Sequence, residues 1–122
     1  MHAWHIAHGA RMAPFAGYDM PISYPTGAIE EHAITRRSVG LFDIDHMGQF
    51  EVSGPGADDF VALMVSAKIS DMKPPMARYS LLLDEDGHVI DDLFVYRMPG
   101  YWWIVVNASN RDTDLAWFLS HA

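Results

Sequence analysis

The chain has 122 residues, half of them hydrophobic and a fifth charged, which are the size and composition of one ordinary globular domain. Its 16 acidic and 8 basic residues give a formal charge of -8 without a basic stripe, and it has no cysteine. Nucleic acid is therefore not expected as a partner, and disulfides and thiolate metal sites are excluded.

Residues 1–45 are expected to form part of a first, incomplete subdomain. Three elements are predicted there: a helix stub at 2–8, a strand at 12–16 and a helix from about 26 or 28 to 38. The last helix has two glutamates in its first turn and two arginines in its last, the order that the helix dipole favours. These elements are too few to bury a core of their own.

Three histidines in the first helix, His2, His5 and His8, have a spacing that could hold a metal ion on one face. They lie at the start of the chain without carboxylate support, so we expect solvated histidines and no metal site. The acidic stretch around Asp84 does not form a calcium loop either, because Leu82 stands where a ligand is needed.

Residues 46–122 have the pattern of an α+β subdomain. The predicted order is a strand at 48–52, a helix from Pro55 to about Ser66, strands at 77–83, 88–97 and 101–107, and a helix from near Asn110. This β-α-β-β-β-α order predicts an antiparallel sheet with helices packed on one face. The sequence stops as the last helix ends, where a returning strand commonly completes such a sheet. We therefore expect a fragment of a larger protein, with exposed apolar surface that favours self-association.

The feature that points most directly to a function is the adjacent pair Asp91 and Asp92 inside the predicted strand 88–97. Neighbouring strand residues point to opposite faces, so at least one carboxylate is expected among apolar side chains. A buried carboxylate needs a hydrogen-bonding partner or a chemical task. The alternative is a purely structural pair that accepts hydrogen bonds from backbone amides or an arginine.

Hairpin geometry gives an expected register for this strand. A four-residue loop at 84–87 would place Tyr79 opposite Asp92. A two-residue turn at 99–100 would place Asn107 opposite Asp92 from the other side. The same face would carry five further apolar or aromatic residues: Ile90, Phe94, Tyr96, Trp103 and Val105. A row of phenol, carboxylate and carboxamide among aromatics is typical of a wall that binds a flat heteroaromatic ligand.

The chain carries six separated motifs. They are the segment from Gly9 to Pro21, Glu31-His32, the segment from Gly40 to Gly48, Tyr79-Ser80, the segment from Gly87 to Leu93, and the segment from Val105 to Ala108. In this order they resemble the N-terminal third of the glycine cleavage T-protein family, whose members are aminomethyltransferases. The resemblance covers essentially the whole chain, although members of the family are considerably longer.

The resemblance implies an enzyme that takes the aminomethyl group from the lipoyl arm of the H-protein, transfers the one-carbon unit to tetrahydrofolate and releases ammonia. It assigns proton transfer beside the reacting folate nitrogens to Asp92. The positions that match the family's folate pocket are Met47, Tyr79, Asp92, Tyr96 and Asn107. This piece alone is expected to be inactive. Since it has neither a long apolar run nor a leader pattern, we expect no membrane span or signal peptide and a bacterial cytoplasmic location.

One position departs from the family pattern and leaves the substrate open. Asp45 stands two residues before Met47, where the family usually has serine. One alternative is a tetrahydrofolate-dependent demethylase of the same superfamily. Another, of a different class, is a non-catalytic folate-binding module, but the presence of Asp92 and Asn107 favours catalysis.

Overall fold

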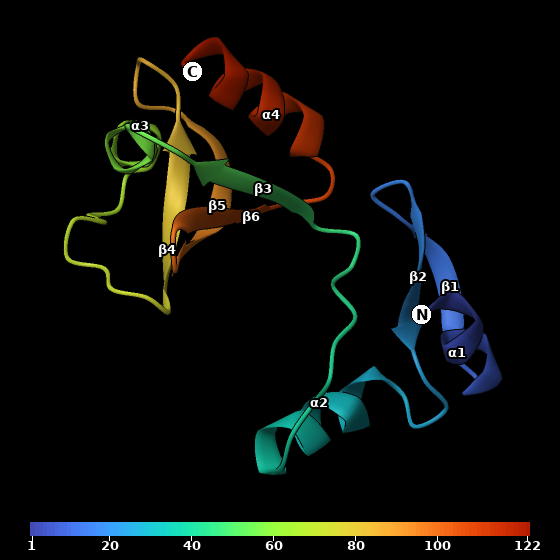
Figure 1. Ribbon diagram of the computed structural model, residues 1–122. Helices are drawn as coiled ribbons and strands as arrows, with labels where there is room; N and C mark the ends of the chain where they lie inside the picture. Colours follow the sequence, from blue (N-terminus) through green and yellow to red (C-terminus); the bar gives the residue numbers. More distant parts are fainter. The chain divides into compact units, whose positions relative to one another are not determined.

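The computed structural model describes residues 1–122, which form two compact units, Met1–His46 and Met47–Ala122 (Figure 1). The first unit contains α1 (His2–Ala7), β1 (Arg11–Phe15), β2 (Tyr18–Ser23) and α2 (Ala28–Arg37). The second contains β3 (Gly48–Ser53), α3 (Ala57–Met64), β4 (Met76–Leu83), β5 (Val89–Met98), β6 (Tyr101–Val106) and α4 (Arg111–Ser120). None of these helices combines the length and the apolar character needed to cross a bilayer.

The strand that sequence reasoning missed is β2, which pairs antiparallel with β1. Its residues lack an apolar run and include Pro21, so their pattern predicts no strand. The hairpin is determined by its turn instead: Ala16 and Gly17 both have positive φ, 49° and 82°, as a type I′ turn requires. Phe15 and Tyr18 pair directly across this turn.

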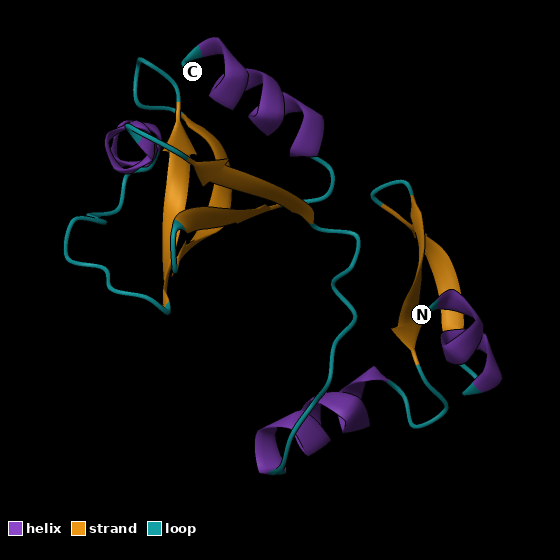
Figure 2. Ribbon diagram, in the orientation of Figure 1, coloured by secondary structure: helices purple, strands orange, loops and turns teal.

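The second unit has the α+β fold that the sequence predicts. Its four strands form one antiparallel sheet in the order β3-β6-β5-β4, accompanied by α3 and α4 (Figure 2). The helix α3 is shorter than predicted. It ends at Met64, because Val65 is extended and forms a bridge with Leu82 of β4.

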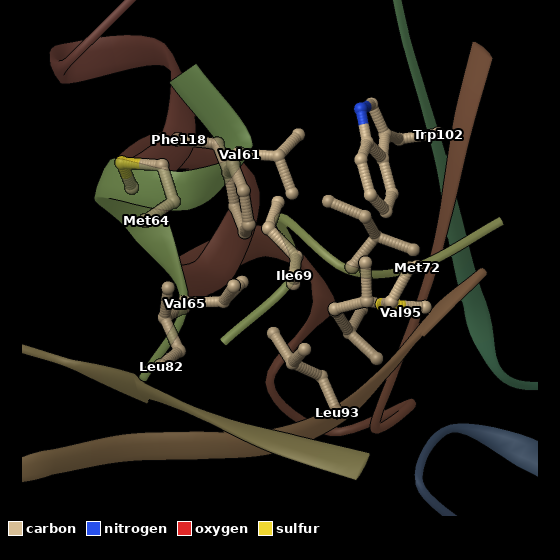
Figure 3. Packing of buried hydrophobic residues seen from close by; sticks show 12 residues of the cluster. Val61, Met64, Val65, Ile69, Met72, Leu82, Leu93, Val95, Trp102 and Phe118 are labelled. Atoms are coloured by element: carbon tan, nitrogen blue, oxygen red, sulfur yellow. The ribbon is translucent and has the colours of Figure 1, made fainter. Parts of the chain in front are cut away.

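Both helices cover the same face of the sheet, because their buried side chains join one hydrophobic cluster with alternate strand residues (Figure 3). Val61 and Met64 enter the cluster from α3, and Phe118 enters it from α4. The strands contribute every second residue: Leu82 from β4, Leu93 and Val95 from β5, and Trp102, Ile104 and Val106 from β6. The intervening residues point to the opposite face, which we call the open face.

Gly48 begins β3 at a point where the sheet is tightly packed. A Cβ atom at this position would lie 2.6 Å from Cγ2 of Val106 and 2.7 Å from Cγ of Arg111, closer than packed carbon atoms come. We expect Gly48→Ala to lower the free energy of unfolding by about 1–3 kcal/mol, since the strand must shift to admit the methyl group. Urea unfolding of Gly48→Ala beside Gln49→Ala, whose side chain is exposed, measures the effect. Equal stability of the two variants would contradict the close packing.

Candidate functional site

The adjacent aspartates of β5 lie on opposite faces of the sheet. Asp91 shares the helix-covered face with Leu93 and Val95 and is only 5% exposed. Asp92 lies on the open face and is exposed. The carboxylate expected among apolar residues is therefore Asp91, and Asp92 is the one that a ligand can reach.

The register between β4 and β5 differs from the predicted one. Tyr79 pairs with Phe94 rather than with Asp92, and Asp92 pairs with Leu81. The predicted pairing of Tyr79 with Asp92 is therefore wrong by two residues. Because a strand alternates faces with every residue, a shift of two leaves Tyr79 on the same face as Asp92.

Two local features cause this shift. First, the loop between the strands is one residue longer than predicted, since Leu83 pairs with Val89. The Asp84 carboxylate stabilises this loop by accepting a hydrogen bond from the backbone N–H of His88 at 2.8 Å. An irregularity of the ladder between Leu82 and Leu83 adds the second residue. Neither feature follows from counting residues in an ideal hairpin.

The pairing of β5 with β6 agrees with the prediction. Met98 pairs with Tyr101 across the two-residue turn at 99–100. Asn107 follows directly after β6, and its Nδ2 lies 3.1 Å from both the backbone oxygen and Oδ1 of Asp92. The structure therefore brings Asn107 and Asp92 together as expected.

A row of aromatic rings accompanies these polar groups on the open face. Ring centroids lie 5.6 Å apart between Tyr79 and Phe94, 6.3 Å apart between Phe94 and Tyr96, and 5.2 Å apart between Tyr96 and Trp103. The row crosses three strands, and Tyr79 and Phe94 are 54% and 44% exposed. An exposed aromatic surface with a carboxylate and a carboxamide beside it fits a flat heteroaromatic ring with polar edges.

The Tyr79 hydroxyl is linked to Asp92. Partial desolvation raises the pKa of the Tyr79 phenol above its usual value, and the hydrogen bond to the negatively charged Asp92 raises it further. The phenol therefore stays protonated and donates toward the carboxylate. Tyr79, Asp92 and Asn107 meet on the open face, although Tyr79 reaches Asp92 diagonally rather than across the ladder.

Met47 and Asp45 lie in different units. Met47 is half-buried and directly precedes β3. Gly48 pairs with Val106 at the end of the ladder between β3 and β6, so the same register extended by one residue places Met47 opposite Asn107. Asp45 belongs to the first unit, where its backbone N–H donates to Oδ1 of Asp43 at 2.9 Å. Met47 is thus associated with the open face through β3.

On the helix-covered face, a second carboxyl group meets Asp91. Asp114, in the first turn of α4, is 0% exposed, and no N–H or O–H group of another residue hydrogen-bonds to its carboxyl oxygens. Burial, together with the Asp91 carboxylate, raises the pKa of Asp114 to about 7. Burial opposes ionisation of Asp91 as well, but hydrogen bonds from Asn107, Asn110 and Asp114 hold the pKa of Asp91 below its usual value. Between the low pKa of Asp91 and about pH 7 the pair therefore holds one proton, on Asp114.

Sequence reasoning did not identify this pair. The acidic residues at the start of the last helix, including Asp114, have the ordinary placement that the helix dipole favours. A signal for burial was nevertheless present. Asp114 precedes the core residue Phe118 by four positions and so lies on the same helical stripe.

The raised pKa of Asp114 predicts a pH dependence of stability. The folded chain keeps this proton up to about pH 7, whereas an unfolded aspartate releases it near pH 4. The contribution of the protonated group is fully present below about pH 4 and is lost as the pH rises toward 7, by on the order of 1 kcal/mol per pH unit. Over this window the free energy of unfolding of the wild type should fall relative to that of Asp114→Asn. Urea unfolding at several pH values measures this, and a constant difference between the proteins would contradict it.

The first unit contains a buried histidine, contrary to the expectation that all three N-terminal histidines are solvated. His5 is 3% exposed, with Nδ1 2.7 Å from the Tyr24 hydroxyl and Nε2 2.7 Å from Oδ2 of Asp43. A hydrogen bond from the Asp45 backbone and the contact with His5 hold the pKa of Asp43 below its usual value. The network ties α1 to the segment that follows α2.

The fold and the sequence together define the family. The family described as GCVT N-terminal domain matches residues 1–122, and the chain belongs to it. This confirms the predicted membership of the glycine cleavage T-protein family.

Individual relatives are bacterial proteins named aminomethyltransferase. Identity is 44% over 122 residues with that of Prosthecochloris aestuarii, covering 99% of this chain and 33% of the relative. It is 46% over 118 residues with that of Bacteroides fragilis, covering 96% and 32%. The crystal structure of glycine cleavage system aminomethyltransferase T from Bartonella henselae matches with a TM-score of 0.92 at 37% identity, covering 99% of this chain and 34% of that one. The chain thus spans about a third of the length of these relatives.

Proposed function

We propose that this chain is part of a tetrahydrofolate-dependent aminomethyltransferase of the glycine cleavage system and provides one wall of its folate site. The observation that carries the proposal is the open face, where Asp92 and Asn107 accompany a partly exposed aromatic row. A pterin ring is flat and has nitrogen atoms at its edges, so it matches such a surface. Similarity to proteins named aminomethyltransferase supports the reaction.

The proposed reaction moves one carbon between two carriers. The aminomethyl group is bound through sulfur to the lipoyl arm of the H-protein. Its C–N bond breaks to release ammonia, its C–S bond breaks to return a thiol, and the carbon forms two new bonds to nitrogens of tetrahydrofolate. The two protons lost by these nitrogens equal the two gained by the sulfur and the amine. A group that accepts and returns protons beside the folate nitrogens therefore assists the transfer.

In this proposal Asp92 is the group that handles protons. The amide of Asn107, 3.1 Å from its Oδ1, and the hydroxyl of Tyr79 orient its carboxylate. Tyr96 and Met47 line the ring-binding surface together with these groups. The remainder of the site and the docking surface for the lipoylated H-protein are proposed to come from the longer protein, for which we propose a bacterial cytoplasmic location.

The test uses the full-length protein that carries this segment. Calorimetric titration with tetrahydrofolate should detect binding, and lipoylated, aminomethyl-loaded H-protein should release ammonia only when tetrahydrofolate is present. Unlipoylated H-protein is the matched control and should release none. Absence of folate binding would contradict the site. Folate binding with demethylation of sarcosine or dimethylglycine, and without ammonia release, would instead indicate a demethylase.

A further inference from the structure

We propose that Asp114 is a positioning residue for the folate site: its protonated carboxyl group donates a hydrogen bond to Asp91, which in turn holds Asn107 against Asp92. This inference deepens the proposed function and rests on it for its kinetic readout. Its spectroscopic readout is independent of the reaction. The evidence is the set of contacts around Asp91.

The contacts of Asp91 leave one acceptor position for Asp114. Oδ1 of Asp91 accepts hydrogen bonds from Nδ2 of Asn107 and Nδ2 of Asn110, both at 2.9 Å. Its Oδ2 accepts one from the backbone N–H of Asn107 at 3.2 Å. A carboxylate has about four lone-pair sites, so the remaining one lies on Oδ2. Asn110 connects this position to Asp114: its backbone oxygen accepts from the Asp114 N–H at 2.9 Å, and its Nδ2 donates to Asp91. The buried carboxyl group of Asp114, whose oxygens have no other partner, can therefore fill it.

An ionised carboxylate at Asp114 would be unfavourable at this place. The side chain is 0% exposed, receives no hydrogen bond from an N–H or O–H donor and faces another carboxyl group. Desolvation of an unpaired charge and repulsion between two adjacent carboxylates both favour a retained proton. Asp91, in contrast, is stabilised as an anion by its amide donors. The shared proton therefore resides on Asp114 and is donated to Asp91.

The chain of contacts runs from α4 to the open face. Asp114 lies in α4, Asp91 in β5 and Asn107 directly after β6. Asp91 accepts hydrogen bonds from both the backbone N–H and the side-chain Nδ2 of Asn107. These two bonds orient the Asn107 amide so that its Nδ2, and not its oxygen, faces Asp92. Without the donor at Asp114, Oδ2 of Asp91 would lose a hydrogen bond and its hold on Asn107 would loosen.

Three variants separate a hydrogen-bond donor from a side chain that only fills space. Asp114→Asn keeps an N–H donor in nearly the same shape. Asp114→Leu keeps a similar volume but removes the donor. Asp112→Asn is the matched control, because this aspartate lies in the same first turn of α4 with its side chain 84% exposed.

The kinetic test uses the full-length enzyme with H-protein and tetrahydrofolate. We expect Asp114→Leu to lower kcat about 10- to 100-fold, the loss of one hydrogen bond to a charged group, with KM for tetrahydrofolate nearly unchanged. Asp114→Asn and Asp112→Asn should stay within about twofold of the wild type. A wild-type kcat in Asp114→Leu, or an equal loss in Asp114→Asn, would overturn the proposal.

The spectroscopic test uses the same protein without substrate. At about pH 6 the infrared difference between the wild type and Asp114→Asn should contain the carbonyl band of a protonated carboxylic acid. The NMR signal of the Asn107 side-chain amide should be displaced in Asp114→Leu and not in Asp114→Asn. Absence of the acid band would overturn the proposal even if Asp114→Leu fails to fold. If the acid band and the displaced Asn107 signal are both observed but the wild type releases no ammonia, the contacts from Asp114 to Asn107 are supported and only the proposed function is overturned.

Discussion

Asp92→Asn in the full-length protein is expected to lose most turnover while binding tetrahydrofolate nearly normally. Asparagine has the same shape as aspartate and keeps an oxygen that accepts from Asn107, but it cannot accept and return a proton. A positioned acid–base group contributes about 10²- to 10⁴-fold to the rate, so kcat should fall by that factor. Ammonia release measures kcat, and calorimetric titration measures the folate affinity.

The matched control for this prediction is Asp59→Asn. Asp59 is an exposed aspartate in the first turn of α3, away from the open face, and its substitution should leave both quantities unchanged. Unchanged turnover in Asp92→Asn would remove Asp92 from the mechanism. A loss confined to folate binding would show that the carboxylate binds the ring and does not transfer protons.

Leu82→Ala is expected to cause the largest loss of stability. Leu82 of β4 is 0% exposed and belongs to the central hydrophobic cluster, where it pairs with Val65 beyond the end of α3. Truncation removes apolar contacts and leaves a cavity, so the free energy of unfolding should fall by about 2–5 kcal/mol. Urea unfolding monitored by circular dichroism measures this change.

Leu63→Ala is the matched control for the core substitution. Leu63 is a leucine of α3 that is 72% exposed, and its truncation should change the stability of this chain by no more than about 0.5 kcal/mol. Equal losses in the two variants would contradict the assignment of the core to the helix-covered face.

The faces of the strand residues could be predicted from sequence because strand side chains alternate. The apolar residues Leu93 and Val95 identify one face of β5, and Phe94 and Tyr96 identify the other. Asp92 could therefore be placed with the aromatics before its neighbours were known. From Asp91 to Tyr96 the alternation holds even though the ladder with β4 differs from the predicted one by two residues. The expected placement of Ile90 on the open face is wrong, because Ile90 lies beside the irregularity of the ladder and packs against the buried cluster.

The register itself could not be predicted from residue counting. It depends on the hydrogen bonds that Asp84 makes with the loop and on the irregularity between Leu82 and Leu83. Both depend on how the backbone satisfies its hydrogen bonds locally, and several loop lengths compete at similar energy. The β2 strand was missed for a related reason, because its pairing depends on the turn at Ala16-Gly17 more than on its own residues.

By itself the sequence determined the family, the α+β order of the second unit and the face on which Asp92 lies, because these follow from motifs and local periodicity. Only the tertiary structure decided which polar groups meet in the interior. Asp91 lies 19 residues from Asn110, and His5 lies 38 residues from Asp43. Such contacts exist because packing of distant segments excludes water and leaves buried polar groups to bind one another, which no local pattern encodes.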